Sequence, residues 1–233
     1  LQTHKEVTDL LFTGGDPMIM KNKIFANYID AILEADIPHL QTIRIGTKAL
    51  GYWPYKFITD DDADDTLRTF EKIVRHGKNL AIMAHFNHPV ELSTEAVKTA
   101  IKRILQTGAQ IRTQSPVMKN INAHPDIWAA MWRQQVNLNC IPYYMFVARD
   151  TGAQHYFKVP LVEAWEIFRK AYQQVSGVCR TVRGPSMSAM PGKIQILGIS
   201  ETGGKKIMTL RFLQGRNPDW AARPFFAEFD DQA

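Results

Sequence analysis

The most informative stretch of the sequence is Leu10-Leu11-Phe12-Thr13-Gly14-Gly15-Asp16-Pro17, in which an apolar strand runs directly into a turn. Such a turn can present backbone amides and one carboxylate at a single point. Four further apolar runs end in polar residues, at Gly46-Thr47-Lys48, His85-Phe86-Asn87-His88, Gln114-Ser115 and Arg149-Asp150. The segments between consecutive runs have helical periodicity. The pattern predicts alternating strands and helices, with five strand ends facing one site.

The spacing of the strands predicts a parallel sheet. Strand starts near Thr8, Thr42, Asn79, Gln110 and Ile141 are 34, 37, 31 and 31 residues apart, which matches the roughly 30 residues of a strand-helix-strand unit. Five units are too few for a closed eight-stranded barrel, so the alternatives are an open doubly wound sheet and a partial barrel. Polar residues at every strand end favour an α/β fold with a partial TIM-like barrel over residues 1–178, lacking its first strand.

The pattern changes after residue 178, and residues 179–233 are expected to form a separate C-terminal segment. Arg180 to Lys193 looks irregular, whereas two apolar runs around Glu201-Thr202-Gly203-Gly204 predict a β-hairpin. The tail from Asn217 is aromatic without a clear period. It is expected to pack onto another part of the protein or onto a second subunit, which would make a homo-oligomer.

The helices carry apolar stripes that predict their buried faces. In the first helix Ile24, Tyr28, Ile32 and Ala35 fall on one side, and that side is expected to face the sheet.

Composition places the chain among ordinary globular proteins. It has 233 residues, 45% of them apolar, and a formal net charge of +5. The basic residues are scattered, so nucleic-acid binding is not indicated. No apolar run is long enough to span a bilayer, and a reducing cytoplasm is the expected location. The start at Leu1, with a polar lead before a buried-looking strand, suggests a fragment of a longer protein.

The residues of the first turn suit a ligand. Gly14 and Gly15 let the backbone approach a bound molecule closely, and Asp16 can accept hydrogen bonds from an ammonium group. The polar end of an amino acid or of a nucleotide cofactor would fit. The alternative is that Gly-Gly-Asp-Pro is only a turn, since Gly and Pro punctuate most loops.

Two other sets of residues allow more than one interpretation. Asp16, His85, His88 and Asp150 could hold a metal ion, as in barrel hydrolases, although histidines in such a loop more often fix its conformation by hydrogen bonds. Lys193 follows Pro-Gly, where its amine could enter a pocket and form a Schiff base, although a lone lysine is usually solvated.

Several motifs occur in the order and spacing of one known family. They are Leu11-Phe12-Thr13-Gly14-Gly15-Asp16-Pro17, Ile37-Pro38-His39, Ile43-Arg44-Ile45-Gly46-Thr47, His85-Phe86-Asn87-His88-Pro89, Gln114-Ser115, Pro142-Tyr143-Tyr144 and Ser176-Gly177. With them the chain resembles the lysine 2,3-aminomutase family of radical S-adenosylmethionine enzymes. The resemblance covers roughly Leu10 to Lys193, and several motifs in register are far more specific than any single one.

The resemblance implies an isomerase that moves an amino group between carbons 2 and 3 of a small amino acid. It implies three cofactors, a [4Fe-4S] cluster, S-adenosylmethionine and pyridoxal 5'-phosphate. The S-adenosylmethionine contacts that it implies are Gly14, Gly15, Asp16, Thr47, Lys48 and Gln114. By the same resemblance Lys193 would carry pyridoxal phosphate, and Asp150 would be one of two carboxylates that grip the distal ammonium of a lysine substrate.

Three departures from the family pattern are visible in the sequence. The Cys-x3-Cys-x2-Cys motif is absent, and Cys140 and Cys179 cannot replace it because a site-differentiated cluster needs three thiolates in one loop. This chain is therefore expected to be inactive by itself, and a non-catalytic domain that keeps the barrel for binding or assembly is a further alternative. Ser186 stands where lysine-using members place their second carboxylate, which leaves the substrate open. Lys48 replaces an Arg, so the charge is kept and the planar fork is lost.

Overall fold

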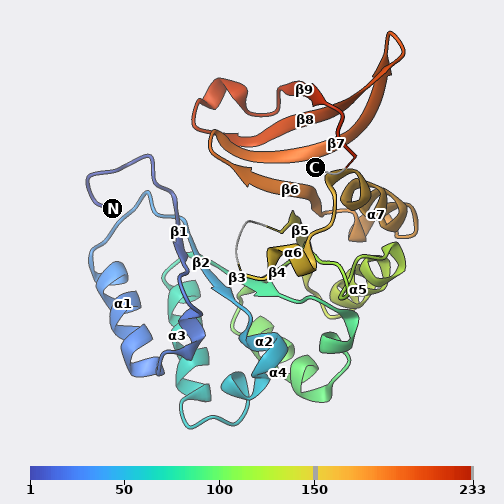
Figure 1. Ribbon diagram of the computed structural model, residues 1–233. Coiled ribbons are helices and arrows are strands. Elements are labelled where there is room, and N and C mark those ends of the chain that lie inside the picture. The colour runs from blue at the N-terminus through green and yellow to red at the C-terminus, as the bar shows by residue number, and fades with distance from the viewer. Residues whose placement is uncertain (149–151, 232–233) are drawn as a thin grey trace. The chain divides into compact units, whose positions relative to one another are not determined.

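The computed structural model describes residues 1–148 and 152–231 (Figure 1). By its internal contacts the chain divides into two compact units. The first comprises Leu1–Thr113 with Gln134–Ile141, and the second comprises Gln114–Arg133 with Pro142–Ala233. Strand β4 (Gln110–Val117) and helix α5 (Pro125–Asn137) cross the boundary. The division expected at residue 178 stays a prediction.

The first unit is built from parallel strands and the helices that connect them. Its strands are β1 (Asp9–Phe12), β2 (Thr42–Thr47) and β3 (Asn79–His85). Its helices are α1 (Asn22–Glu34), α2 (Ala49–Tyr52), α3 (Ala63–Arg75) and α4 (Glu95–Gln106), with short 3-10 turns at Pro17–Ile19, Pro54–Phe57 and Pro89–Leu92. β1 pairs with β2 and β2 with β3, all in parallel. The predicted α/β fold with parallel strands is confirmed.

The core of this unit contains a row of aromatic rings. Phe25 of α1 lies 5.8 Å from Phe12 of β1 and 6.2 Å from Phe70 of α3, measured between ring centroids. The face predicted for α1 was therefore wrong. Ile24 and Tyr28 are 51% and 54% exposed, because α1 buries its other apolar stripe, which contains Phe25 and Ile29. The face of α1 that carries the Phe25 ring is buried because this ring removes a large apolar area from water.

The second unit combines parallel strand pairing with an antiparallel sheet. Its elements are β5 (Ile141–Val147), α6 (Gln154–Phe157), α7 (Leu161–Gln173), a 3-10 turn at Gly177–Cys179, β6 (Arg183–Ala189), β7 (Gly192–Thr202), β8 (Lys205–Gly215), a 3-10 turn at Pro218–Trp220 and β9 (Pro224–Glu228). β5 pairs with β6 in parallel, and β6 to β9 pair antiparallel in sequence order.

The C-terminal segment confirms one prediction and corrects another. The hairpin is present as β7 and β8, with Gly203 and Gly204 in its turn at φ +59° and +74°. The stretch from Arg180 to Lys193 is not irregular, because half of it forms β6 and its last two residues begin β7. The aromatic tail adds strand β9 to the same sheet. A homo-oligomer through the tail stays a prediction.

None of the helices within residues 1–148 and 152–231 has the length and apolar character needed to cross a membrane. The cytoplasmic location stays a prediction.

Candidate functional site

The turn after β1 is tied to the end of β2 through one carboxylate. Asp16 Oδ2 accepts hydrogen bonds from Thr47 Oγ1 at 2.9 Å and from the Lys48 backbone N–H at 2.7 Å, while Oδ1 accepts one from the Met18 N–H at 3.0 Å. The structure thus brings together three residues that the sequence placed at two different strand ends. The carboxylate is fixed in direction before any ligand arrives.

The two glycines of this turn have conformations that favour glycine. Gly14 has φ +96° and Gly15 has φ +57°, and both are exposed. A side chain at either position would adopt a backbone conformation that L-residues rarely use. The turn therefore offers exposed backbone beside the Asp16 carboxylate.

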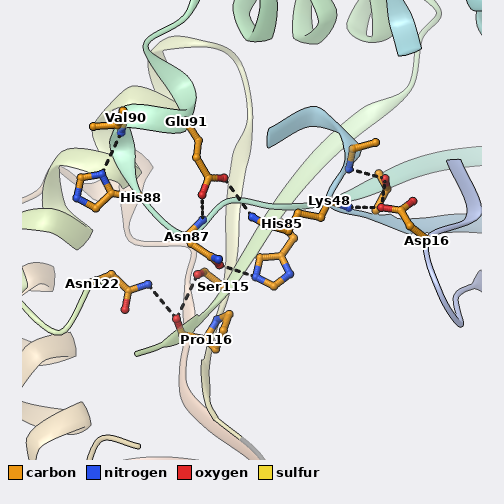
Figure 2. A network of polar contacts seen from close by, with 12 residues as sticks. Asp16, Lys48, His85, Asn87, His88, Val90, Glu91, Ser115, Pro116 and Asn122 are labelled. Carbon is orange, nitrogen blue, oxygen red and sulfur yellow. Dashed lines mark hydrogen bonds and ion pairs between the residues drawn. The ribbon is translucent and has the colours of Figure 1, made fainter. Parts of the chain in front are cut away.

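A second set of polar contacts extends from Lys48 (Figure 2). Lys48 Nζ lies 3.3 Å from Glu91 Oε2, and Glu91 Oε1 accepts a hydrogen bond from the Asn87 N–H at 3.2 Å. His85 Nε2 is 2.7 Å from Asn87 Oδ1. Asn87 and Glu91 were not among the predicted site residues. The available signal was Pro89, which opens the 3-10 turn that carries Glu91.

Gly51 makes room for Glu91. A Cβ atom at Gly51 would lie 2.6 Å from Glu91 Oε2, which is closer than non-bonded atoms approach. The position of the Glu91 carboxylate therefore depends on the absence of a side chain at residue 51.

Burial and charge set the protonation of the groups around this network. Burial, followed by the positive charge of Lys48, lowers the pKa of His85 to about 4. His85 is therefore neutral near physiological pH. Partial desolvation, followed by the charge of the nearby Asp16 carboxylate, raises the pKa of Tyr52 above its ordinary value, so the phenol keeps its proton.

The described residues of the metal-site alternative, Asp16, His85 and His88, do not form a metal site. His85 is hydrogen-bonded to Asn87, and His88 Nδ1 accepts a hydrogen bond from the Val90 N–H at 3.3 Å. Within the described residues no three His, Cys, Asp or Glu side chains are placed to hold one ion. Asp150 lies outside the described residues. The histidines fix their loop, and the hydrolase alternative is not supported.

The second unit presents Lys193 from a regular strand. The Lys193 ammonium lies 4.3 Å from the ring centroid of Tyr144 and 5.3 Å from that of Phe146, and these two rings stack at 5.2 Å. Lys193 is paired with Ser188 across β6 and β7. Its amine is therefore positioned by a sheet and by aromatic faces, not by a flexible loop as the sequence suggested.

Ser186 and Gln114 are the remaining predicted contacts that the structure describes. Ser186 is fully buried in β6, and its hydroxyl donates to the Met145 carbonyl at 3.3 Å. Gln114 is half-buried in β4. Asp150, the other predicted substrate contact, lies outside the described residues.

The cysteines of the chain do not fit an iron-sulfur cluster. Cys140 and Cys179 are both buried, and burial raises the pKa of the Cys140 thiol to about 12. A cluster needs thiolates that converge in one loop. Any cluster would have to take its ligands from outside this sequence.

Comparison with curated proteins identifies aminomutases as relatives of this chain. No protein-family model matches the chain. The chain is 33% identical over 198 residues to a protein of Aquifex aeolicus provisionally named as an L-lysine 2,3-aminomutase, covering 85% of this chain and 51% of that protein. It is 24% identical to the glutamate 2,3-aminomutase of Clostridioides difficile, covering 94% of this chain and 46% of the relative. It is 28% identical to the L-lysine 2,3-aminomutase of Bacillus subtilis, covering 74% and 34%.

The relatives are aminomutases, a class of isomerases. The chain belongs to the 2,3-aminomutase family. The chain spans about half the length of the two Aquifex aeolicus relatives that it matches. Among solved structures, a domain of a pyruvate-formate lyase-activating enzyme from Bacteroides vulgatus matches with a TM-score of 0.49 and 11% identity, covering 77% of this chain and 98% of that domain.

Proposed function

We propose that this chain supplies the S-adenosylmethionine and pyridoxal phosphate sites of a radical amino acid 2,3-aminomutase, with its parallel strands forming part of a partial barrel. The observation that carries the proposal is the Asp16 carboxylate, which three donors hold beside the exposed backbone of Gly14 and Gly15. The motif that resembles the family's cofactor turn is thus preorganised at a strand end. Similarity to aminomutases over most of the chain supports the same proposal.

The first unit is suited to the amino-acid end of S-adenosylmethionine. Asp16 would accept hydrogen bonds from its ammonium group, and the backbone of Gly14 and Gly15 would lie against it. Thr47 would hold Asp16 in place through the hydrogen bond already described. Lys48 would place a positive charge near the carboxylate of the cofactor. Gln114 belongs to the second unit, and its contact with the cofactor stays a prediction of the family resemblance.

The second unit is suited to pyridoxal phosphate. Lys193 offers a primary amine on a regular strand, beside the stacked rings of Tyr144 and Phe146. A planar cofactor ring is compatible with such aromatic faces. Ser186 and Asp150 would contact the substrate.

Cofactors would supply the difficult chemistry, with S-adenosylmethionine as the radical source and pyridoxal phosphate as the carrier of the amino group. The side chains of this chain would bind, orient and exclude water. The cysteines do not fit the cluster, so no role in it is assigned to them. The protein would be an isomerase acting on a small amino acid.

Substitution of Lys193 tests whether this residue binds pyridoxal phosphate. Pyridoxal phosphate added to the purified protein should give the visible absorption band of a lysine-bound cofactor, and borohydride followed by peptide mapping should locate it on Lys193. Lys193→Ala should lose the band, while the matched control Lys205→Ala, at the exposed hairpin turn, should keep it. A band of unchanged intensity in Lys193→Ala would refute the assignment.

A further inference from the structure

One face of the antiparallel sheet in the second unit is polar and positively charged. The register pairs Ser186 with Gln195 and Ser188 with Lys193, and Gln195 is paired in turn with Arg211. Directly paired residues lie on the same face of a sheet, as do residues two apart in one strand. Ser186, Ser188, Lys193, Gln195 and Arg211 therefore share one face.

The opposite face is the apolar core of the unit. Ile194, Ile196 and Leu210 are at most 6% exposed and pack with Trp165 of α7. Figure 1 shows α7 beside this sheet. Lys193 and Arg211 therefore lie on the face of the sheet opposite to this core.

Arg211 is held on this face by a neutral side chain. Its Nε donates to Gln195 Oε1 at 2.9 Å, and Gln195 Nε2 donates in turn to the Gly184 carbonyl at 3.2 Å. Gln195 is buried, so this arrangement fixes the plane of the guanidinium. Within residues 1–148 and 152–231 no carboxylate forms an ion pair with Arg211. The two terminal nitrogens of the Arg211 guanidinium can therefore bind a carboxylate in a bidentate manner.

Arg211 is at a suitable distance from Lys193. Gln195 follows Lys193 by two positions, about 7 Å along β7, and Arg211 lies one strand further, about 5 Å away. The two Cα atoms are thus about 8 Å apart on one face. Two long side chains at this separation can contact opposite ends of a molecule the size of an amino acid.

Ser186 completes the row that Gln195 and Arg211 form across three strands. Its buried hydroxyl carries no charge and donates to the Met145 carbonyl. The row therefore presents a cation and no anion to a ligand held near Lys193. A carboxylate is attracted to such a row, and an ammonium group is repelled by it.

We propose that Arg211 binds the side-chain carboxylate of the substrate, so that this protein acts on an acidic amino acid. The proposal rests on the proposed function, because it takes Lys193 as the lysine that holds pyridoxal phosphate. The same guanidinium chemistry would also suit the phosphate of the cofactor, so the experiment separates the two anions.

The test measures amino-acid binding to the protein loaded with pyridoxal phosphate, from the change in its visible spectrum. Glutamate should bind about 10-fold to 100-fold more tightly than glutamine, the neutral analogue of the same shape, since one hydrogen-bonded charge pair has this effect. Arg211→Gln should abolish the difference while pyridoxal phosphate affinity stays within about twofold. Arg211→Lys should retain part of the preference for glutamate, because the positive charge stays and the planar guanidinium group is lost.

The matched control is Arg216→Gln, which removes an exposed arginine just beyond the end of β8 and should keep the preference for glutamate. Equal binding of glutamate and glutamine by the unaltered protein would overturn the proposal. So would tighter binding of lysine than of glutamate, or a preference that survives in Arg211→Gln. Weaker binding of pyridoxal phosphate by Arg211→Gln, with the preference unchanged, would assign Arg211 to the phosphate. A protein that gives no lysine-bound cofactor band at all would instead refute the proposed function.

Discussion

Removal of the Glu91 carboxylate should destabilise the first unit by about 2 kcal/mol. Lys48 and Glu91 have side chains that are 35% and 23% exposed, so their ion pair at 3.3 Å should contribute about 1 kcal/mol, near the upper end for pairs in contact with solvent. The hydrogen bond from the Asn87 N–H to the same carboxylate should add about 1 kcal/mol. In Glu91→Ala both contributions are lost.

Urea unfolding and amide exchange would measure this effect. The unfolding midpoint of Glu91→Ala should fall, and the Asn87 amide should exchange faster with solvent because its acceptor is gone. Glu91→Gln keeps an oxygen for that amide and should lose about 1 kcal/mol or less. The matched control is Glu95→Gln, since Glu95 is 86% exposed in its pair with Lys98 and should contribute almost nothing.

Gly51→Ala provides an independent perturbation of the same contact. Its Cβ would meet Glu91 Oε2 at 2.6 Å, so the carboxylate must move away from its present position. The effects of Gly51→Ala and Glu91→Ala should therefore be less than additive in a double-mutant cycle. Additive effects, or a Glu91→Ala variant as stable as Glu95→Gln, would refute the reasoning.

Three further predictions follow from the buried and charged groups. Acidification from about pH 6.5 to about pH 4 should lower the free energy of unfolding by up to about 3 kcal/mol, because His85 binds a proton more readily in the unfolded protein than in the folded one. Urea unfolding at a series of pH values should show that His85→Gln reduces this pH dependence. The control His76→Gln, at an exposed histidine, should leave it unchanged. The Cys140 thiol, whose pKa is about 12, should react with a chromogenic disulfide reagent only after unfolding, and rapid reaction of the folded protein would contradict its burial. Asp16→Asn should weaken S-adenosylmethionine binding about tenfold by calorimetry, Lys48→Met should weaken it less, and exposed Asp36→Asn should leave it unchanged.

Regular spacing made the first half of the fold predictable. The expected strand starts at Thr42, Asn79, Gln110 and Ile141 coincide with the first residues of β2 to β5, because each apolar run is bounded by residues that end helices. The buried face of α1 was not predictable by the same means. That helix has two apolar stripes, and only packing against Phe12 and Phe70 selects the one with Phe25.

The C-terminal sheet shows where local pattern stops being informative. β6 contains Gly184, Pro185 and two serines, and β9 begins with Pro224, so neither has the alternation of a typical strand. Both strands exist because the hairpin offers them a partner. Their pairing is a long-range property that periodicity does not encode.

The candidate site also contains residues that the sequence predicted and residues that it did not. The sequence predicted that Asp16, Thr47 and Lys48 face one site because strand ends in a parallel sheet lie at one edge, and the family resemblance implied that they contact a cofactor. It did not predict Glu91 or Arg211, since each acts through a partner chosen by tertiary structure. Glu91 meets Lys48 from a position 43 residues away, and Arg211 meets Gln195 only through a strand register that contains two bulges.

The partner of Lys48 also limits what this lysine can contribute. An ammonium group is a point charge without the fork of an arginine, and here Glu91 already compensates that charge at 3.3 Å. In the proposed site a cofactor carboxylate would have to share Lys48 with Glu91 or displace it, and displacement would also remove the acceptor of the Asn87 N–H. Asp16 faces no such competition, since its three donors are neutral and hold it in place. Most of the electrostatic selectivity of the turn should therefore come from Asp16, with Lys48 and Glu91 together keeping the loop that carries His85 in position.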